Sequence, residues 1–474
     1  MSDALSAEVV AQLEYLERSF LQPRRFAIDP RGGPDAATRC DFDVVLAGGG
    51  LSLFYAAYLA SRGRRVAVFD RRPIGVGHRE WNISRRELAP LVDSGLFTEQ
   101  EVAALVVLDY RHGIVRWHGG GTYPVIGVLD SVVDAEPLLT ALRDRCVRHG
   151  ATLLPQHELV GYRVGPGGVA VEVRELATGQ RRTLTSELLL DGLGASSPHA
   201  RFDLVCPTVG GVLTGLDEGE AVNQVDYSIG EILATTEDVE EGQQHVWEGF
   251  PGPGKRYTTY LFYYTEPSRL PPRSLQALYE RFFRVRARYK AGPAEMEKPT
   301  FGFIPAYTRL GDMPASPCDR VLLVGDAAGR HSPLTFCGFG SMVRSFLPVG
   351  RAVETALETR RLDRRTLAAA WREPAALQVM GGLTLMMVAG RSRRPQAPGA
   401  INQLLDVAFG TLFEQGNEVF GAFVRDEIDF PQFVRFMNRT AERLPGLYDR
   451  VFATLTKGEL LRYSARLARM GLRI

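Results

Sequence analysis

The hydrophobic and polar positions over residues 41–70 predict a strand, a tight turn, a helix and a second strand. Residues 44–46 form an uninterrupted apolar run, as in a strand buried in a parallel sheet. Three consecutive glycines follow, and a mostly apolar segment over 51–62 then predicts a helix with a glycine as its stop signal. Another apolar run over 66–69 predicts the second strand. This order of elements indicates an α/β fold.

The glycine turn carries chemistry that a plain α/β turn does not need. Gly48, Gly49 and Gly50 let the backbone turn sharply and approach a pyrophosphate, and the helix behind them points its N-terminal amides at that anion. Asp70 closes the second strand, where a carboxylate accepts hydrogen bonds from a ribose diol. Leu53 stands where the fingerprint has its third glycine, so we expect looser packing of helix on strand. Together these features predict a dinucleotide site.

After this unit the pattern predicts a helix and then a meander of short strands. The helix covers 134–150, with an early proline and a terminal glycine. Glycine-containing turns separate three strands, at about 159–164, 169–174 and 183–190. The last strand runs into Asp191 and a glycine, a second place where backbone is able to meet a dinucleotide. By itself this second signal is weak.

Residues 206–316 differ in character from the chain before them, because proline and glycine become frequent and aromatic strands appear. Residues 246–250 and 257–264 predict paired strands joined through a Pro-Gly-Pro-Gly turn. We interpret this part as a substrate domain rich in flat apolar side chains. Trp247 and Phe250 are its candidates for substrate contact.

Glu248 stands between a tryptophan and a glycine on the first of these strands. Burial raises the pKa of a carboxyl group, which keeps it protonated and able to act as an acid. An exposed position on the outer face of the strand is the alternative, and the pattern favours neither.

The pattern returns to the α/β type with an apolar run over 321–324 that predicts a buried strand. A glycine and an aspartate follow this strand directly, and a carboxylate just past a strand end is able to accept from sugar or ribitol hydroxyls. Two further glycines precede an apolar helix and predict another cradle of backbone amides. The candidates for cofactor contact in this part are Gly325, Asp326, Gly338, Phe339 and Gly340.

The loop that follows the strand predicted at 66–69 is also a candidate site. Arg71 is able to neutralise a cofactor phosphate, although a solvated arginine is slightly favoured. Polar residues and a tryptophan crowd into 78–85, and loops over a rigid scaffold tend to hold site residues. Glu80 and Trp81 are therefore candidates for catalysis and for substrate contact. Ser84 suits a helix N-cap at least as well as a catalytic role.

The length, net charge and cysteine content of the chain exclude several classes of function. The chain has 474 residues, enough for two to three domains and a large core. A net charge of +1 without a basic, aromatic-interleaved block argues against a nucleic-acid partner. The five cysteines form no CxxC pair, so we expect no metal site, no disulfides and a reducing compartment. The N-terminus lacks the basic and apolar regions of a signal peptide, which favours the cytoplasm.

The C-terminal region, residues 371–474, is expected to be helical. Residues 374–390 carry no charge, but the segment is short for a membrane span and a glycine pair weakens it, so a buried or interfacial helix is favoured. The final helix places arginines on one side and Leu460 and Met470 on the other. It is able to lie on an anionic membrane, although a solvated face over a core is slightly favoured.

Taken together, the triple glycine with Asp70, the DGLGASS segment and the GDAAG and GFG motifs resemble the FAD-binding segments of the p-hydroxybenzoate hydroxylase-like flavoproteins. The resemblance covers about 41–350 and implies FAD as the cofactor. It implies that Gly48, Gly50 and Asp70 hold the pyrophosphate and ADP ribose. It also implies that Asp326 faces the ribitol and pyrophosphate, with the amides of the GFG motif beside the flavin.

Within that superfamily, three segments are similar to lycopene cyclases of the CruA/CruP type. They are REWNISRREL at 79–88, VWEGFP with RYTTYLFYY within 246–264, and GDAAGRHSPLTFCGFGS at 325–341. In hydroxylases and reductases a GxG motif usually follows the proline closely. Here the residues LTFC separate Pro333 from Gly338, which fits the cyclase branch better.

This branch implies the redox-neutral cyclisation of a linear carotenoid end group, with reduced FAD and no net electron transfer. The resemblance makes Glu248 or Glu80 the proton donor, NAD(P)H a candidate external reductant, and an apolar molecule such as a carotenoid the substrate. Such a substrate also favours peripheral contact with a membrane surface. The alternative is an FAD-dependent monooxygenase or double-bond reductase acting on another apolar metabolite. The oligomeric state stays open.

We therefore expect an α/β (α+β) fold. A Rossmann-like FAD-binding domain of the p-hydroxybenzoate hydroxylase/glutathione reductase type would carry an inserted antiparallel β-sheet substrate domain and a helical C-terminal region. The expected parts are an N-terminal helical extension and linker (1–40), a discontinuous FAD-binding domain (41–205 and 317–370), the substrate domain (206–316) and the helical region (371–474).

Overall fold

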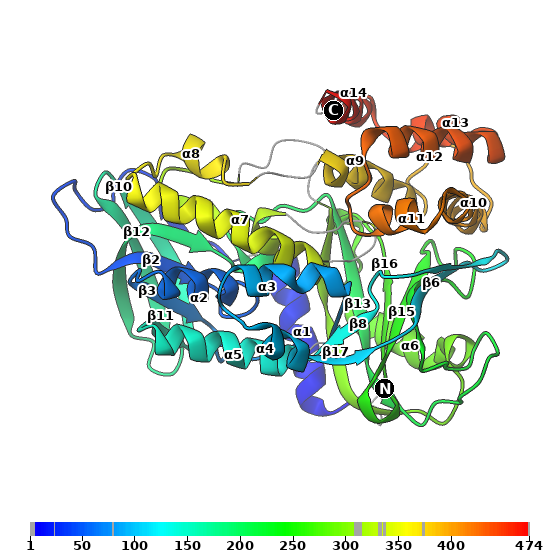
Figure 1. The fold of residues 1–474 in the computed structure, drawn as a ribbon, viewed down its shortest axis with the longest axis horizontal. Coiled ribbons are helices and arrows are strands. Elements are labelled where there is room, and N and C mark those ends of the chain that lie inside the picture. The colour runs from blue at the N-terminus through cyan, green and yellow to red at the C-terminus, as the bar shows by residue number, and fades with distance from the viewer. Residues whose placement is uncertain are drawn as a thin grey trace.

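The computed structural model of the chain describes residues 5–22, 24–77, 80–307, 315–329, 334, 338–371 and 375–472. Two large sheets lie side by side, and helices of the C-terminal region cover the end of the second sheet (Figure 1). The expected fold class, a mixed α/β core with an antiparallel sheet domain and a helical C-terminal region, is confirmed. His78 and Arg79 of the polar loop at 78–85, and Pro333 of the segment at 325–341, lie outside the described residues.

The described strands form three sheets. In spatial order the first contains β1 (Ala27–Asp29), β10 (His157–Gly165), β11 (Gly168–Glu175), β12 (Arg181–Asp191), β2 (Phe42–Ala47), β3 (Val66–Asp70) and β9 (Thr152–Pro155), with β18 (Val321–Leu323) on β12. The second contains β17 (Glu295–Tyr307), β13 (Leu204–Thr214), β16 (Arg256–Tyr263), β15 (His245–Gly252), β14 (Ile229–Ala234), β6 (His112–Arg116) and β7 (Thr122–Val125). The third contains β4 (Trp81–Ile83), β8 (Ser131–Val133) and β5 (Val106–Asp109).

The described helices fall before, between and after these strands. Those of the first two-thirds are α1 (Ala7–Leu21), α2 (Leu53–Ser61), α3 (Ala89–Asp93), α4 (Glu99–Leu105), α5 (Ala135–Arg148) and α6 (Ser274–Tyr289). Those of the last third are α7 (Gly338–Glu358), α8 (Arg364–Ala368), α9 (Ala375–Thr384), α10 (Ala400–Gln415), α11 (Asn417–Val424), α12 (Phe430–Arg443), α13 (Leu447–Thr454) and α14 (Lys457–Gly471).

The first sheet brings the carboxyl ends of its parallel strands to one edge. β2 pairs in parallel with β12 and β3, and β18 pairs in parallel with β12. Apolar side chains of α2, α5 and α7 pack on one face of this sheet. The β10–β11–β12 meander curls over the other face and buries its own apolar side chains there. In α/β folds, ligands bind at this carboxyl edge.

The second sheet is antiparallel except where β14 and β6 run parallel. β6 and β7 belong to the expected range 41–205, so this range contributes strands to both large sheets. One face of the sheet packs on α6. The other face packs on the C-terminal helices, with Val246, Phe250 and Phe262 in one apolar cluster with Phe409 and Phe423.

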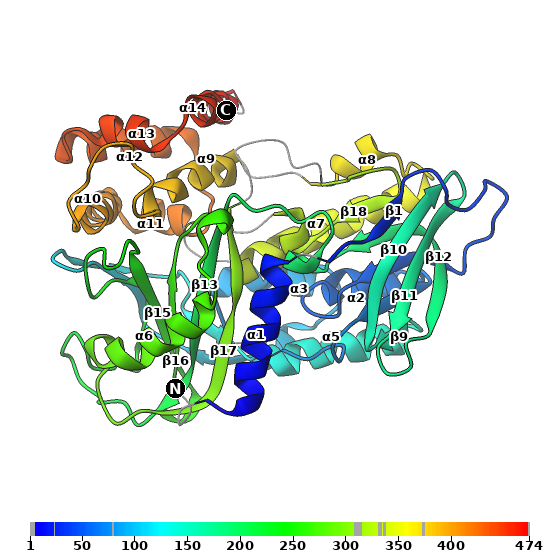
Figure 2. The same cartoon turned by 180° about the vertical axis from the view of Figure 1, so that it is seen from behind.

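Helix α1 lies alongside β17, as the view from behind shows (Figure 2). The Glu17 carboxylate, which is buried, accepts a hydrogen bond from the backbone N–H of Leu275 at the start of α6, at 2.6 Å. The Phe20 and Phe303 rings stack at 4.3 Å between centroids. The expected N-terminal helix therefore fastens onto the second sheet and its covering helix.

The local predictions are confirmed for most elements. Two helices differ from expectation: a 3-10 turn, Arg85–Leu88, begins where a helix was expected, and the apolar segment after residue 374 divides into α9 and a 3-10 turn, Leu385–Met387. Ser84 stands at the N-cap of this 3-10 turn, where the Glu87 carboxylate accepts from the Ser84 backbone N–H at 3.1 Å, and the Ser84 hydroxyl accepts from the Leu129 backbone N–H at 3.2 Å. Among the described residues, we find no helix long and apolar enough to cross a membrane.

Candidate active site

The glycine turn is built so that backbone, and not side chains, faces the carboxyl edge of the first sheet. Gly48 adopts a φ of 113°, and a Cβ there would lie 2.4 Å from the carbonyl oxygen of Gly192. Only glycine fits this contact. A Cβ on Gly50, in contrast, would meet no described heavy atom within 4 Å. The backbone of Gly50, just ahead of α2, therefore borders open space, as a phosphate cradle requires.

Asp70 fastens the glycine turn. One oxygen of its carboxylate accepts from the Gly49 backbone N–H at 2.7 Å, and the other accepts from the Arg72 backbone N–H at 2.8 Å. Each carboxylate oxygen accepts more than one hydrogen bond, so these contacts leave capacity for a ribose hydroxyl. Arg71 points elsewhere: its guanidinium lies 3.4 Å from the Glu158 carboxylate and over the Tyr15 ring.

The second and third glycine-containing turns meet beside the first. Asp191 is buried and accepts from the Ser197 hydroxyl at 2.6 Å and from the Leu193 backbone N–H at 3.1 Å. Burial raises the pKa of Asp191 to about 6. The Asp191 carboxylate thus stabilises the turn that follows β12, and the backbone of Gly192 in that turn lies against Gly48. The turn at Gly194–Ser196 packs against the turn at Gly325–Ala328.

Asp326 is exposed at the end of β18, on the edge where these turns converge. A Cβ on Gly194 would lie 3.8 Å from the Asp326 Cβ, and a Cβ on Gly325 would lie 2.7 Å from the Met342 side chain. A Cβ on Gly338, at the start of α7, would meet no described atom within 4 Å. The expected cofactor residues of this part are therefore brought to the same edge as the glycine turn.

Trp81 and Phe339 come together although sequence reasoning assigned one to substrate and the other to cofactor. Their rings stack with centroids 4.8 Å apart and planes 19° apart. A Cβ on Gly340 would lie 2.6 Å from the Glu87 carboxylate, which also pairs with Arg344. The start of α7 is thus held against the loop that follows β4, and an aromatic pair stands beside the open space at Gly338.

Glu248 faces the same side of β15 as Val246 and Phe250. Both of those side chains belong to the apolar cluster shared with the C-terminal helices. Glu248 keeps some accessible surface, but the surrounding protein raises its pKa to about 8 by desolvation, against a hydrogen bond from the Asn82 side chain that favours the ionised form. The carboxyl group is therefore protonated at neutral pH. The alternative of a solvated outer position for Glu248 is wrong.

Two tyrosines lie near this acid, and one of them reaches the backbone just before β4. Tyr260 stands opposite Glu248 in the β15–β16 register, and its hydroxyl is 3.5 Å from the backbone oxygen of Glu80. The Tyr264 hydroxyl donates to the Leu334 backbone oxygen at 3.0 Å, and burial raises the pKa of Tyr264, with further contributions from Cys206 and Glu248. Tyr260 thus links the strand opposite Glu248 to the backbone of Glu80, whereas the Glu80 carboxylate pairs with Lys298.

Glu80 has the more polar surroundings of the two candidate carboxyl groups, Glu80 and Glu248. One oxygen of its carboxylate lies 3.2 Å from the Lys298 ammonium, and the other is buried without a hydrogen-bond partner among the described residues. A buried acceptor without a donor is costly, so this oxygen is available to a ligand. Lys298 and Asn82 were not among the expected site residues. The alternation of β4, which points Trp81 one way and its neighbours the other, is the signal that would have identified Asn82.

Trp247 is not part of this group. It is fully buried on the opposite face of β15, where its ring stacks on Tyr289 at 4.6 Å and lies 5.5 Å from Phe282 of α6. Phe250 is equally buried, but on the side of Glu248. The strand therefore separates Trp247 from Phe250, two of the three aromatic residues that were predicted to contact substrate.

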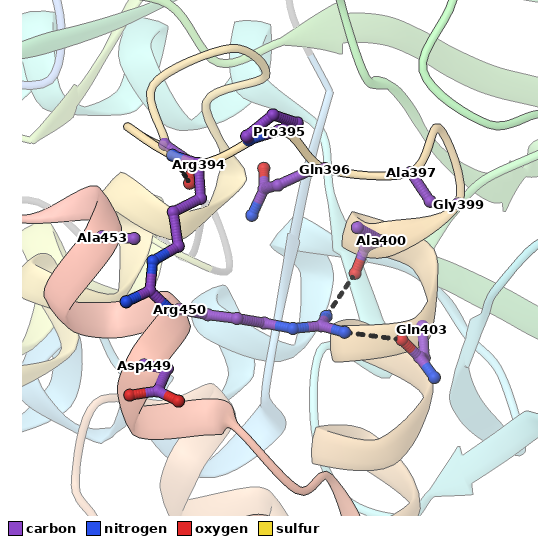
Figure 3. Close-up of a pocket in the computed structure, with 11 residues that line it drawn as sticks. Arg394, Pro395, Gln396, Ala397, Gly399, Ala400, Gln403, Asp449, Arg450 and Ala453 are labelled. Carbon is purple, nitrogen blue, oxygen red and sulfur yellow. Dashed lines mark hydrogen bonds between the residues drawn. The ribbon is translucent and has the colours of Figure 1, made fainter.

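A surface pocket lies in the C-terminal region, away from these residues (Figure 3). It is bordered by the loop before α10, by the start of α10 and by α13. Arg450 spans it and donates to the Ala400 backbone oxygen at 3.3 Å and to the Gln403 side chain at 2.8 Å. Arg394 and Gln396 on its rim are exposed. None of the expected site residues lines it.

Comparison with curated proteins finds a partial match. A segment is 26% identical over 185 residues to aklavinone 12-hydroxylase DnrF of Streptomyces peucetius, covering 34% of this chain and 37% of the hydroxylase. The chain therefore matches little more than a third of that relative's length. No protein-family model matches the chain.

Solved structures match over most of the chain. A geranylgeranyl bacteriochlorophyll reductase-like protein from Thermoplasma acidophilum gives a TM-score of 0.56 at 13% identity, covering 90% of this chain and all of that one. Halogenase PltM in complex with phloroglucinol and FAD gives 0.59 at 12% identity, covering 91% of each chain. The flavin-dependent halogenase CmlS gives 0.58 at 17% identity, covering 92% of this chain and 77% of that one. This chain thus has the fold of FAD-dependent oxidoreductases.

Proposed function

We propose that this protein binds FAD at the carboxyl edge of the first sheet and uses Glu248 as an acid on an apolar, unsaturated substrate. The residues present fit such a cofactor, since a Cβ on Gly50 or Gly338 would meet no described heavy atom within 4 Å while Asp70 retains acceptor capacity. When bound in its reduced, anionic form, FAD supplies negative charge beside a developing cation, or a hydride. The fold shared with FAD-dependent enzymes supports this assignment.

The observation that carries the proposal is the position of the Glu248 carboxyl group, on the face of β15 that also carries Val246 and Phe250 and beside the Asn82 side chain. A carboxyl group with a pKa of about 8 holds its proton at neutral pH and is close to the ideal strength for proton donation there. Phe250 and Val246 on the same face exclude water and suit a hydrocarbon. Asn82 orients the carboxyl group through its hydrogen bond.

The reaction we favour is cyclisation of a linear carotenoid end group. Glu248 gives its proton to a terminal carbon–carbon double bond, and the carbocation is attacked by a second double bond to close the ring. A proton then leaves the ring, so the product is an isomer of the substrate and no electrons are transferred. The ion-paired Glu80, with its unpartnered oxygen, is the candidate acceptor for that proton.

An oxidoreductase is the second candidate, and the similarity to a hydroxylase segment and to a reductase-like fold favours it. Reduction of a double bond also needs an acid, because a hydride on one carbon must be matched by a proton on the other. Glu248 would serve that reaction equally. Hydroxylation would not require it in the same way.

Product mass separates these reactions. The purified protein, loaded with FAD and reduced without oxygen, is incubated with lycopene dispersed in detergent, and the products are analysed by mass spectrometry. An isomer of lycopene supports cyclisation, whereas a gain of two hydrogens, or of one oxygen once air is admitted, supports an oxidoreductase. Glu248→Gln should abolish either acid-dependent product, with Trp247→Phe on the opposite face as the control. Failure of the wild-type protein to bind FAD would refute the proposal as a whole.

A further inference from the structure

Helix α14 has two apolar faces, although the sequence pattern predicted one. Leu460, Tyr463, Leu467 and Met470 pack against the C-terminal part of the apolar core. On the other side, Leu461, Ala465, Ala468 and Leu472 recur at helical spacing and are exposed. Leu461 is 74% exposed and Leu472 is 85% exposed, which is unusual for two leucines on one stripe. This exposed stripe has no partner among the described residues.

Positive charge borders the stripe. Arg462 and Arg469 are exposed and lie next to it around the helix. From Leu447 to Leu472, α13 and α14 carry five basic and two acidic residues, although the whole chain carries a net charge of only +1. Glu459, one of the two acids, is paired with Arg391. The exposed charged residues of this surface are Lys457, Arg462 and Arg469 against Asp449, so its exposed charge is positive.

Helix α13 also exposes large apolar side chains. Tyr448 and Phe452 lie one turn apart on α13 and are 45% and 55% exposed. Arg393, in the loop that precedes α10, donates to the backbone oxygen of Leu455 at 3.1 Å and also to that of Phe452, which fixes the loop beside the end of α13. In both views α13 and α14 lie at the outer edge of the molecule (Figures 1 and 2).

We propose that α14, together with α13, docks this protein on a bilayer that contains anionic phospholipids. A helix lying in the plane of a membrane interface buries an apolar stripe among acyl chains and places flanking arginines at the phosphate groups. The stripe and arginines of α14 match this arrangement. A second copy of the chain fits less well, because self-association through this face would bring the arginines of both copies close together. The proposal is independent of the reaction proposed above.

Vesicle flotation of the full-length protein tests this proposal. Wild-type protein should float with vesicles of phosphatidylglycerol and phosphatidylcholine, bind vesicles of phosphatidylcholine alone less, and lose binding as salt is raised. The double variant Leu461→Ser/Leu472→Ser should reduce the partition coefficient by about tenfold or more, as should Arg462→Gln/Arg469→Gln. Both pairs are exposed, so we expect unchanged thermal unfolding, which shows that the variants fold.

Matched controls keep the test specific. Val147→Ser/Val222→Ser removes two exposed apolar side chains, 58% and 65% exposed, from other surfaces, and Arg148→Gln/Arg163→Gln removes two exposed charges. Neither control should change flotation. The proposal is overturned if wild-type protein does not float at low salt, or if the controls reduce binding as much as the α14 variants. It is also overturned if sedimentation shows a dimer that Leu461→Ser/Leu472→Ser dissociates.

Discussion

The two faces of β15 bury ionisable side chains under similar conditions and with opposite consequences. Glu248 points toward β4 and the C-terminal helices, and burial raises its pKa to about 8. His245 points toward α6, and burial together with Arg281 and Arg284 lowers its pKa to about 3. Desolvation disfavours the charged form in both cases. The neutral form of a carboxyl group carries an acidic proton, whereas neutral imidazole at this pKa does not serve as a proton donor.

The surroundings of the two residues differ as well. Glu237, the carboxylate beside His245, is already paired with Arg281, so it does not hold a proton on the imidazole. Among the described residues, the Asn82 side chain is the hydrogen-bond partner that acts on Glu248, and Asn82 lies next to Trp81, whose ring stacks on Phe339. The comparison teaches that burial alone does not mark a functional acid. What the desolvated group faces decides its role.

The largest expected effect is the loss of activity in Glu248→Gln. If this carboxyl group donates the proton, product formation should fall by about 100-fold to 10,000-fold, because the amide keeps the shape but has no acidic proton. Turnover under anaerobic conditions with reduced FAD measures this. His245→Gln, three residues away on the other face, should leave the rate per folded molecule nearly unchanged. Equal losses of rate in both variants would contradict the functional difference that we propose between the two faces of β15.

Trp247→Ala should act on stability instead of chemistry. The fully buried indole packs on Tyr289 and Phe282, and its truncation should lower the free energy of unfolding by about 3–5 kcal/mol. Chemical denaturation measures this loss, and turnover of the folded fraction at low temperature should stay close to wild type. Loss of turnover without loss of stability would instead place Trp247 at the substrate.

pH should affect the two faces in opposite directions. Glu248 has a folded pKa above the ordinary 4.5, so the folded protein binds the extra proton and stability falls as pH rises from about 4.5 to about 8. His245 has a folded pKa below the ordinary 6.5, so stability falls as pH drops from about 6.5 toward about 3. Denaturation midpoints across pH should show both losses, with a smaller loss at rising pH in Glu248→Gln and a smaller loss at falling pH in His245→Gln. Activity should also fall above about pH 8.

The smallest expected effect is that of replacing Asn82, the hydrogen-bond partner of Glu248. The Asn82 side chain favours the ionised form of Glu248, so Asn82→Ala should raise the pKa of Glu248 further. The alkaline limb of the pH–activity profile should then move to higher pH, with a modest loss of rate as the carboxyl group becomes less well oriented. Trp81→Phe, on the other side of β4, serves as the control and should not move the limb. A shift to lower pH would mean that Asn82 stabilises the protonated form.

Short-range pattern was sufficient to predict the parallel strands, the glycine turn and the aromatic strands of the second sheet. Alternation along a strand repeats every two residues, and the apolar runs that flank Gly48 or Gly325 report burial directly. The same local information identified Glu248 as a residue that burial would turn into an acid. It did not determine whether burial occurs, because the strand is apolar on both faces.

The amino-acid sequence by itself determined which segments form strands and helices, where the backbone must be glycine, and which carboxyl groups are candidate acids. Only the tertiary structure decided that Asn82 reaches Glu248, that Trp81 stacks on Phe339, and that Trp247 faces away from them. The physical reason is the separation along the chain over which each kind of interaction acts. Hydrogen bonding and periodicity act between near neighbours in the chain, whereas the side of a strand that meets a cofactor depends on which distant helices cover each face.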